Sequence, residues 1–413
     1  MKYSSIFFVI IVLVCVLPAQ TVSDNSSAEK TSGILQQKID AASPYDTLII
    51  DGGIYKEFNV VIKKPLVIIG KNYPVLEIDY KGEGFIIESD SVTIDGWVIQ
   101  HSKPSDLHEN AAIRLSQVKH IQVLNNKITD NYFCIYLAKS DSSIVKNNTI
   151  KSIPKSENTS GNGVHLWKCD AITIENNTIT GTRDGIYLEF VSNSIISGNN
   201  CFKNIRYGLH FMFSNDDAYL KNVFTENGAG VAVMYSKGVQ MHNNTFQKNR
   251  GSSSFGLLLK DITDSEIEGN TFYDNAVAIH MEGSNRVLAK QNSILENGWG
   301  LVITANCTDV AFEKNNFISN SFDVSTNGTL VLNTFNGNYW DKYEGYDLDR
   351  DAMGDVPYHP VSLFAIIVDK IPEAIMLYRS FAQYLIDKAE KILPGLTPEN
   401  LVDKTPYMKP VQL

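Results

Sequence analysis

The chain has 413 residues, of which 43% are apolar and 20% are charged, and its formal net charge is −10 at pH 7. A chain of this length and apolar content can bury a large core, so we expect a folded protein. The negative charge, with no dense run of lysine or arginine to offset it, argues against a nucleic-acid-binding protein.

The N-terminus has the pattern of a secretory signal. Lys2 precedes an apolar run from Ile6 to Leu17, and Pro18-Ala19-Gln20 follows it. The run is too short to span a bilayer comfortably, and no later stretch is long and apolar enough for a transmembrane helix. We predict a signal peptide over residues 1–19, a polar linker over residues 20–32, and export of the remaining chain.

A short amphipathic helix is predicted after the linker, because Ile34, Leu35, Ile39 and Ala42 recur on one helical face. The helix ends near Ser43-Pro44, and a strand follows. If the next residues stack into coils, the open end would expose unpaired backbone and apolar core. We therefore expect this helix to cap the first coil.

A repeat with two markers occupies the chain from about residue 125 to residue 338. The first marker is a strand in which a small residue precedes apolar, variable, apolar and variable positions, as at 163–167, 185–189, 208–212, 230–234, 256–260 and 300–304. The second is Asn-x-(Ile/Phe), whose asparagines are Asn126, Asn148, Asn177, Asn200, Asn222, Asn244, Asn270, Asn292, Asn315 and Asn333.

The spacing of these markers predicts the fold. The commonest interval between the asparagines is 22 residues, which is too short for a helical-hairpin repeat. The repeated segments are short, β-branched and separated by Asn, Gly, Ser and Asp. We predict an all-β fold, a right-handed parallel β-helix of about ten or more coils that spans residues 33–340 with its N-terminal cap.

Each coil of such a fold stacks on the next at about 4.8 Å, so equivalent residues form columns along the rod. The asparagine column is best explained as a structural ladder of stacked amides that satisfies buried backbone groups. Irregular spacing predicts lateral loops at 101–110, 154–162 and 250–254. Insertions of this kind often border the binding face of a solenoid.

Strand side chains alternate, so the two variable positions of the repeated strand point outward and form two columns on one face. The first column is Arg114, Tyr136, His165, Tyr187, His210, Ala232, Leu258, His280 and Val302. The second column is Ser116, Ala138, Trp167, Glu189, Met212, Met234, Lys260, Glu282 and Thr304. We expect one continuous face.

The middle of this face is a candidate copper site. Met212 and Met234 are expected to be neighbours across coils at about 5 Å, with His210 about 7 Å along the strand from Met212. Thioether and imidazole groups are soft ligands suited to Cu(I) and poor ligands for calcium or magnesium. Met241 and His242, one strand further on, add the same ligand types. The alternative is that these side chains only stack and fill space.

The same face also has the residue types of a uronate lyase or epimerase. Arg206 would bind the substrate carboxylate, and His210 or Tyr187 with Asp184 would transfer the proton. The two columns lack the carboxylate cluster or adjacent basic residues that would strengthen this hypothesis.

Residues 341–361 form an Asp-rich turn segment after the repeat. Their acidic spacing resembles a D-x-D-x-D calcium loop, with candidate ligands Asp347, Asp349, Asp351 and Asp355. Tyr358 stands where a calcium loop places a bidentate glutamate. An ordinary Asp-rich turn is the alternative.

Residues 362–413 contain two apolar segments at helical spacing, parted by Pro372, and then a tail with several prolines. We expect this C-terminal helical appendage to cap the rod, to dock to a partner, or to do both.

Several stretches go beyond the repeat and match one known family. They are residues 206–216, 230–236, 255–262, 281–286, 297–307, 337–341, 345–348 and 355–364. On these stretches the chain resembles the NosD family of periplasmic β-helical accessory proteins of nitrous oxide reductase maturation. The resemblance covers essentially all of the chain after the signal and is densest from residue 200 onward.

The resemblance implies a non-enzymatic periplasmic protein. Its partners would be the membrane subunit of an ABC transporter, a copper chaperone and apo nitrous oxide reductase, and copper would be bound transiently. The membrane would be reached only through the transporter. An apolar helix face needs a groove to fill, so the appendage becomes the docking element, with candidate contacts Phe364, Ile375, Phe381 and Leu385. A carbohydrate-active β-helix enzyme and a metal-free scaffold for the partners are the alternatives.

Overall fold

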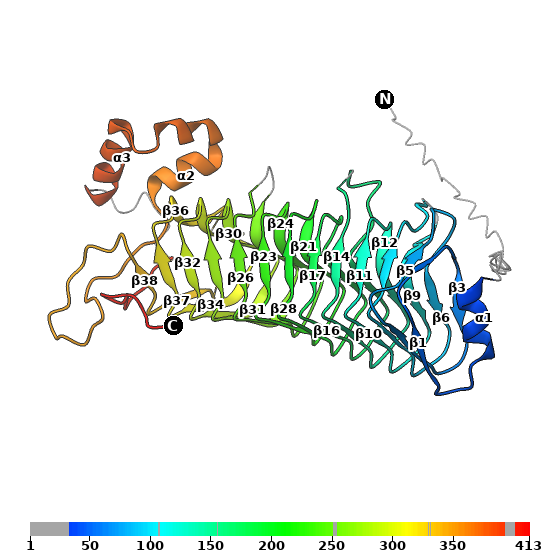
Figure 1. The fold of residues 1–413 in the computed structure, drawn as a ribbon. Coiled ribbons are helices and arrows are strands. Elements are labelled where there is room, and N and C mark those ends of the chain that lie inside the picture. The colour runs from blue at the N-terminus through cyan, green and yellow to red at the C-terminus, as the bar shows by residue number, and fades with distance from the viewer. Residues whose placement is uncertain are drawn as a thin grey trace, which may run out of the picture.

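The computed structural model describes residues 33–105, 108–154, 156–250, 254–328, 330, 332–392 and 401–413. The predicted signal peptide and linker lie outside the described residues. Helix α1 (Ile34–Ala41) is followed by strands β1 to β38, which wind into a rod (Figure 1). Every strand pairs in parallel with the equivalent strand of the next coil, so each coil contributes one strand to each of three sheets. The prediction of a parallel β-helix is confirmed.

Sheet A contains thirteen strands: β1 (Thr47–Ile50), β4 (Val67–Gly70), β7 (Thr93–Asp95), β10 (Gln122–Leu124), β13 (Ile144–Lys146), β16 (Thr173–Glu175), β19 (Ile195–Ser197), β22 (Ala218–Leu220), β25 (Gln240–His242), β28 (Thr263–Glu268), β31 (Asn285–Lys290), β34 (Thr308–Glu313) and β37 (Thr334–Asn336). Sheet B contains thirteen: β2 (Ile54–Tyr55), β5 (Val75–Glu77), β8 (Val98–Gln100), β11 (Lys127–Thr129), β14 (Thr149–Lys151), β17 (Thr178–Thr180), β20 (Asn200–Phe202), β23 (Val223–Thr225), β26 (Thr245–Gln247), β29 (Thr271–Tyr273), β32 (Ser293–Leu295), β35 (Asn316–Ile318) and β38 (Tyr339–Trp340). Sheet C contains twelve: β3 (Val60–Ile62), β6 (Phe85–Ile87), β9 (Ala111–Ser116), β12 (Phe133–Ala138), β15 (Val164–Trp167), β18 (Ile186–Glu189), β21 (Tyr207–Met212), β24 (Ala229–Met234), β27 (Phe255–Lys260), β30 (Val277–Glu282), β33 (Trp299–Ile303) and β36 (Phe322–Thr326).

The core is one continuous column of apolar side chains inside the coils. In most of the three-residue strands only the middle side chain points inward, because side chains alternate along a strand. In sheet B this inner column changes from isoleucine to phenylalanine along the rod. Phe246 and Phe272 stack with centroids 4.5 Å apart, and Phe224 lies 5.5 Å from Phe246. Stacked rings at the coil spacing fill the core without gaps.

The predicted asparagine ladder is confirmed at the corner between sheets A and B. Each member donates its backbone N–H and its Nδ2 to the Oδ1 of the next, through Asn126, Asn148, Asn177, Asn199, Asn222, Asn244, Asn270, Asn292, Asn315 and Asn338. Two predicted members were wrong: Asn200 faces outward in β20, and Asn333 lies before β37. The buried amides satisfy backbone groups that no strand pairs.

A second ladder, which the sequence analysis missed, runs along the corner between sheets B and C. Its members also pass a hydrogen bond to the next Oδ1, through Asn204, Asn227, Asn249, Asn275, Asn297 and Asn320. Both ladders therefore hold the coils in one register along the rod.

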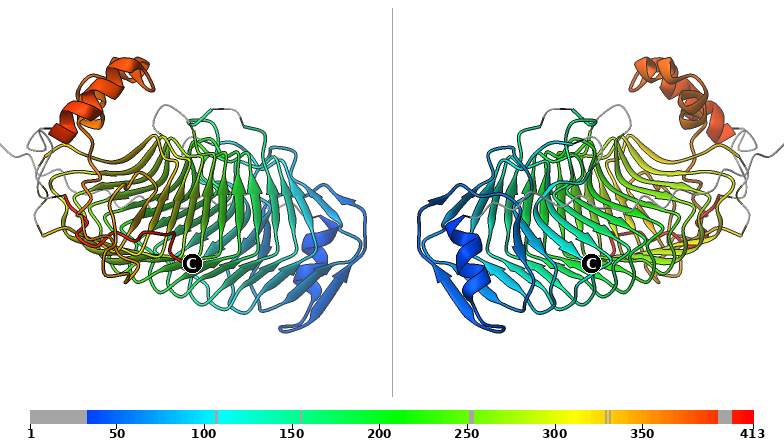
Figure 2. Two further views of the ribbon diagram at one scale, coloured as in Figure 1. Left: turned by 90° about the vertical axis from the view of Figure 1, so that its left-hand side faces the viewer. Right: turned by 90° about the vertical axis from the view of Figure 1, so that its right-hand side faces the viewer.

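Helix α1 caps the N-terminal end as predicted (Figure 2). Leu35 and Ile39 pack on the first coil and are at most 1% exposed. The Gln36 side chain accepts from the Val61 N–H at 2.8 Å and donates to the Val61 carbonyl at 3.0 Å. Gln36 thus takes the place of the missing neighbour strand, which removes the open edge of β3.

The C-terminal appendage consists of α2 (Leu363–Lys370), the 3₁₀ helix η1 (Pro372–Leu377) and α3 (Phe381–Ile392), and it sits over the end of sheet C (Figure 1). Residues 401–413 then return to the last coil, where Asp403 bridges to Phe335 and Tyr407 bridges to Tyr339. The Asp403 carboxylate accepts from the Asn338 N–H and Nδ2 at 2.9 and 3.0 Å, which ends the first ladder. Among the described residues, no helix combines the length and apolarity needed to cross a membrane.

Candidate functional site

Sheet C carries the two outward columns in the predicted register. Tyr136 pairs with Arg114 and His165, Tyr187 pairs with His165 and His210, and the column continues through Ala232, Leu258, His280 and Val302. The second column lies two residues further along each strand and runs over the coils in the same order. In this column Met212 pairs with Met234. The predicted continuous face is confirmed.

Aromatic and imidazole rings follow one another along the first column in a stack of mainly edge-to-face contacts. The ring centroids of Tyr136 and His165 are 5.0 Å apart, those of His165 and Tyr187 are 4.7 Å apart, and those of Tyr187 and His210 are 4.9 Å apart. Burial lowers the pKa of His165 to about 3, so this imidazole is neutral at physiological pH. The stack holds His210 against Tyr187 on one side, while the small Ala232 is its neighbour on the other.

Asp184, Arg206 and His210 form a charged group at the base of this face. The Arg206 guanidinium donates to both carboxylate oxygens of Asp184, at 2.9 and 2.5 Å, and His210 Nδ1 lies 3.5 Å from Asp184 Oδ2. Burial by itself would raise the pKa of Asp184, but hydrogen bonds from His210 and Arg206 outweigh it and lower the pKa to about 2. Asp184 is therefore an ionised, fully buried carboxylate.

Two groups contact His210 Nδ1: the Asp184 carboxylate at 3.5 Å, which favours a proton on Nδ1, and Arg206 Nη2 at 3.4 Å, which can only donate and favours a lone pair there. When Nδ1 donates its proton to Asp184, the lone pair of the neutral ring lies on Nε2. The His210 side chain is 7% exposed, and its Nε2 is shielded from solvent and has no hydrogen-bond partner among the described residues. A buried, unpaired nitrogen is unusual and marks a position where a ligand can bind.

Met212 and Met234 lie beside His210 as predicted. They face each other across adjacent coils, and both side chains are partly exposed. The structure thus brings one imidazole nitrogen and two thioether sulfurs to neighbouring positions on one sheet. This is a soft donor set.

Met241 and His242 do not join this group, so the expected proximity was wrong. Both lie in β25 of sheet A, where Met241 points into the core at 0% exposure and His242 points outward. The strand that follows β24 in the sequence turns the corner onto another sheet, so nearness in the sequence does not place these residues on sheet C.

A third outward column, which the sequence analysis missed, lies at the corner next to the methionines. Phe190, Phe213 and Tyr235 stack with centroids 5.2 and 5.0 Å apart and are 41–46% exposed. All three have positive φ angles, between 52° and 55°. The signal was present in the sequence, because each ring directly follows a residue of the second column.

The lateral loops border this face as predicted. Loops 101–110 and 154–162 both lead from sheet B into sheet C, and part of the 250–254 loop lies outside the described residues. A hollow between the first loop and the sheet is lined by Glu109, His165, Arg183, Tyr187 and Glu189.

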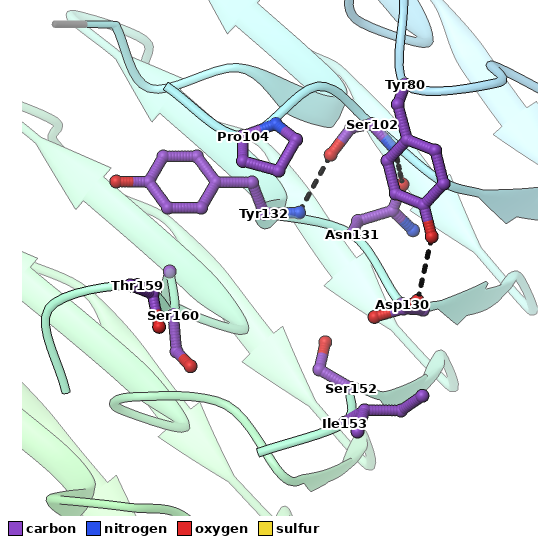
Figure 3. Close-up of a pocket in the computed structure, with 11 residues that line it drawn as sticks. Tyr80, Ser102, Pro104, Asp130, Asn131, Tyr132, Ser152, Ile153, Thr159 and Ser160 are labelled. Atoms are coloured by element: carbon purple, nitrogen blue, oxygen red, sulfur yellow. Dashed lines mark hydrogen bonds between the residues drawn. The ribbon is translucent and has the colours of Figure 1, made fainter. Parts of the chain in front are cut away.

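A small pocket lies between the two loops (Figure 3). The Tyr80 hydroxyl donates to Asp130 at 3.1 Å, and the Tyr132 N–H donates to Ser102 at 2.8 Å (Figure 3). These polar groups are satisfied within the protein, so this pocket has less need of a ligand than the group around His210.

Comparison with known proteins finds one family that this chain resembles. Residues 151–345 match the family model described as "Periplasmic copper-binding protein (NosD)". A relative from Stutzerimonas stutzeri, named "Probable ABC transporter binding protein NosD", is 24% identical over 84% of this chain and 84% of its own length. Over most of its length the chain is similar to members of the NosD family. The matched residues include both methionines and the Asp184–Arg206–His210 group.

Solved structures share the fold of this chain. The catalytic unit of a GH87 α-1,3-glucanase from Streptomyces thermodiastaticus has a TM-score of 0.53 at 14% identity, covering 78% of this chain and 67% of its own. The A-module of the mannuronan C-5 epimerase AlgE6 from Azotobacter vinelandii has a TM-score of 0.50 at 13% identity, covering 74% and 88%. At such identities the likeness concerns the β-helix alone.

Of the four predicted docking residues, Phe364 was wrong. It is 0% exposed and packs on Phe322 with centroids 5.9 Å apart, so it anchors the appendage to sheet C. Ile375, Phe381 and Leu385 are 44%, 73% and 50% exposed. These three remain predicted contacts.

In the Asp-rich turn, Asp347, Asp349 and Asp351 each offer an oxygen within 4.8 Å of the others. Asp355 is not part of this group, and its Oδ2 accepts a hydrogen bond from the Leu348 N–H at 2.6 Å. Asp347 accepts from the N–H groups of Arg350 and Ala352. The carboxylates thus stabilise the turn, and calcium binding stays a prediction.

Proposed function

We propose that this protein binds Cu(I) through His210, Met212 and Met234 in the periplasm and passes it on during maturation of the copper centres of nitrous oxide reductase. Copper is the cargo of such a protein. The observation that carries the proposal is the solvent-shielded, unpaired Nε2 of His210 beside two thioethers. Nitrogen and thioether donors suit Cu(I).

The group around Asp184 supports the proposal, since metal-binding histidines commonly donate their other ring nitrogen to a carboxylate. Arg206 neutralises that carboxylate and keeps it in place. The same pairing weakens the lyase or epimerase hypothesis, because an Arg206 guanidinium committed to Asp184 is not free to bind a substrate carboxylate. A metal-free scaffold is the remaining alternative.

The partners would be the membrane subunit of an ABC transporter, a copper chaperone and apo nitrous oxide reductase. The exposed apolar side chains of η1 and α3 are the contact surface we propose for the transporter subunit, because a contiguous apolar surface on a soluble domain commonly marks an interface. The name of the Stutzerimonas stutzeri relative is consistent with this assignment.

The test is an anaerobic Cu(I) titration against a competing chelator. The Met212→Leu/Met234→Leu variant keeps the volume of both side chains but removes both sulfurs, so we expect at least about a tenfold loss of affinity. Met376→Leu, which alters a methionine that is 86% exposed on the appendage, is the matched control. Asp184→Asn should weaken binding by about 10- to 100-fold through the His210 tautomer. A wild-type protein that binds no Cu(I) would be a scaffold.

A further inference from the structure

A second group of metal-ligand side chains lies on the outer face of sheet A. His242 ends β25, and Glu268 is its partner across the coil in β28, with Glu266 two residues earlier in the same strand. Met241, which precedes His242, and Ile267, which lies between the two glutamates, point into the core at 0% exposure. Alternation therefore directs His242, Glu266 and Glu268 outward from two adjacent coils.

The three side chains are close enough to share one ion. One ligand atom from each lies within 4.8 Å of the other two. His242 Nε2 and Glu266 Oε2 are 3.5 Å apart. A tetrahedral ion with bonds of about 2.0–2.1 Å holds its ligand atoms about 3.4 Å apart. The spacing therefore fits two ligands of one ion.

His242 Nε2 is also shielded from solvent and has no well-formed hydrogen bond to any described residue, although the side chain as a whole is 22% exposed. Leu220 is the partner of His242 on the preceding coil. The His242 Nε2 atom faces the Glu266 carboxylate and forms an ion pair with it when the ring is protonated. A divalent cation that displaces the ring proton would bind this nitrogen and the neighbouring carboxylates.

Lys290 holds the two carboxylates in the metal-free protein. Its Nζ lies 2.7 Å from Glu266 Oε1 and 3.5 Å from Glu268 Oε2. The hydrogen bond from Lys290 is the main reason that the pKa of Glu266 is lowered, so this carboxylate is ionised. Lys290 is also the partner of Glu313 on the next coil, which offers its ammonium another position. The Lys290 ammonium can therefore move away from Glu266 and Glu268 and still pair with the Glu313 carboxylate.

We propose that His242, Glu266 and Glu268 bind one divalent ion of the Zn(II) class, and that Lys290 occupies the site when the ion is absent. One imidazole and two carboxylates suit Zn(II), whereas Cu(I) prefers sulfur and calcium prefers oxygen alone. The ion joins two coils through β25 and β28. This site lies on a different sheet from the Cu(I) site and does not depend on it.

The test is calorimetric titration of the full exported chain with Zn(II). The wild type should bind one Zn(II), and His242→Gln should weaken that binding at least about tenfold. His120→Gln alters an exposed histidine outside the group and should bind as the wild type does. Lys290→Met removes the competing ammonium and should bind Zn(II) more tightly, by about threefold or more.

Two results would overturn this assignment. The first is equal Zn(II) binding by the two histidine variants, and the second is weaker binding by Lys290→Met with its fold intact. Titration of Met212→Leu/Met234→Leu separates the two sites, because Zn(II) binding should survive there. If Met212→Leu/Met234→Leu no longer binds Zn(II), the ion binds on sheet C, and this result would also overturn the proposal.

Discussion

At the scale of single residues, two buried aspartates have pKa values displaced in opposite directions because their partners differ. Burial favours the neutral form of both. At Asp184, hydrogen bonds from His210 and Arg206 outweigh burial and the pKa falls to about 2. At Asp217, burial is opposed by one backbone hydrogen bond from Ser194, and the pKa rises to about 7. Asp217 Oδ2 has no hydrogen-bond partner among the described residues.

Asp217→Asn is therefore expected to stabilise the protein at pH 8 and to change little at pH 4. An unfolded aspartate titrates near pH 3.9, whereas Asp217 titrates near pH 7 in the fold. Between these values the unfolded state has released a proton that the folded state retains, so stability falls as pH rises through this window. Asparagine keeps an acceptor for Ser194 and never ionises.

The difference of about 3 pH units between the two pKa values corresponds to about 4 kcal/mol, so we expect the free energy of unfolding at pH 8 to rise by up to about that amount. Urea unfolding at both pH values measures the change. Asp309→Asn, which alters an exposed aspartate on a distant coil, is the control, because the charge of the adjacent Asp216 itself contributes to the raised pKa of Asp217. An effect of equal size at pH 4 and pH 8 would show that ionisation of Asp217 is not the cause.

At the scale of elements, the order of the outward side chains along sheet C could be predicted from the sequence. The positions at which the chain turns from one sheet to the next could not. The outward order from Arg114 to Val302 followed from strand alternation and a marked first residue in each repeat. The positions of Met241 and His242 did not follow, because the repeated strand marks one sheet of three, and residues 235–239 turn the chain from β24 of sheet C to β25 of sheet A. Asp403 could not be predicted as the end of the asparagine ladder, since it reaches Asn338 from outside the repeat.

Asp403→Ala is expected to loosen the C-terminal end of the rod. The Asp403 carboxylate accepts from the N–H groups of Gly337 and Asn338, from Asn338 Nδ2 and from Trp340 Nε1, at 2.9–3.1 Å. Alanine would leave these buried donors unpaired, at a cost of about 3 kcal/mol.

Hydrogen exchange should show faster exchange in residues 334–341 and 401–413 of Asp403→Ala, with coils before residue 250 unchanged. Asp403→Asn retains one acceptor oxygen and should lie between the wild type and the alanine variant. Uniformly faster exchange along the whole rod would instead mean that the coils unfold as one unit, contrary to the local role assigned to Asp403.

At the scale of the whole molecule, the proposed Cu(I) site and the proposed docking surface lie apart along the rod. The methionines lie on β21 and β24, and the appendage packs on β36, four coils beyond β24 in sheet C (Figure 1). Four steps at about 4.8 Å amount to about 19 Å. Each coil contacts its neighbours through short, regular strands, so a change at one end is transmitted weakly to the middle. Cargo binding and partner binding should therefore be separable by mutation.

Phe381→Asp/Leu385→Asp is the variant that tests this separation. Both side chains are at least half exposed on α3, so charge at these positions should leave the fold and the Cu(I) affinity unchanged. It should weaken association with the transporter's membrane subunit at least about tenfold, because charged groups are costly in the apolar centre of an interface. Co-purification in detergent measures the association. Ile153→Asp, which changes a side chain that is 62% exposed on a lateral loop, is the control. If the double variant associates as well as the wild type does, the docking surface does not lie on α3. If the same variant loses Cu(I) binding, the appendage and the proposed Cu(I) site are coupled along the rod.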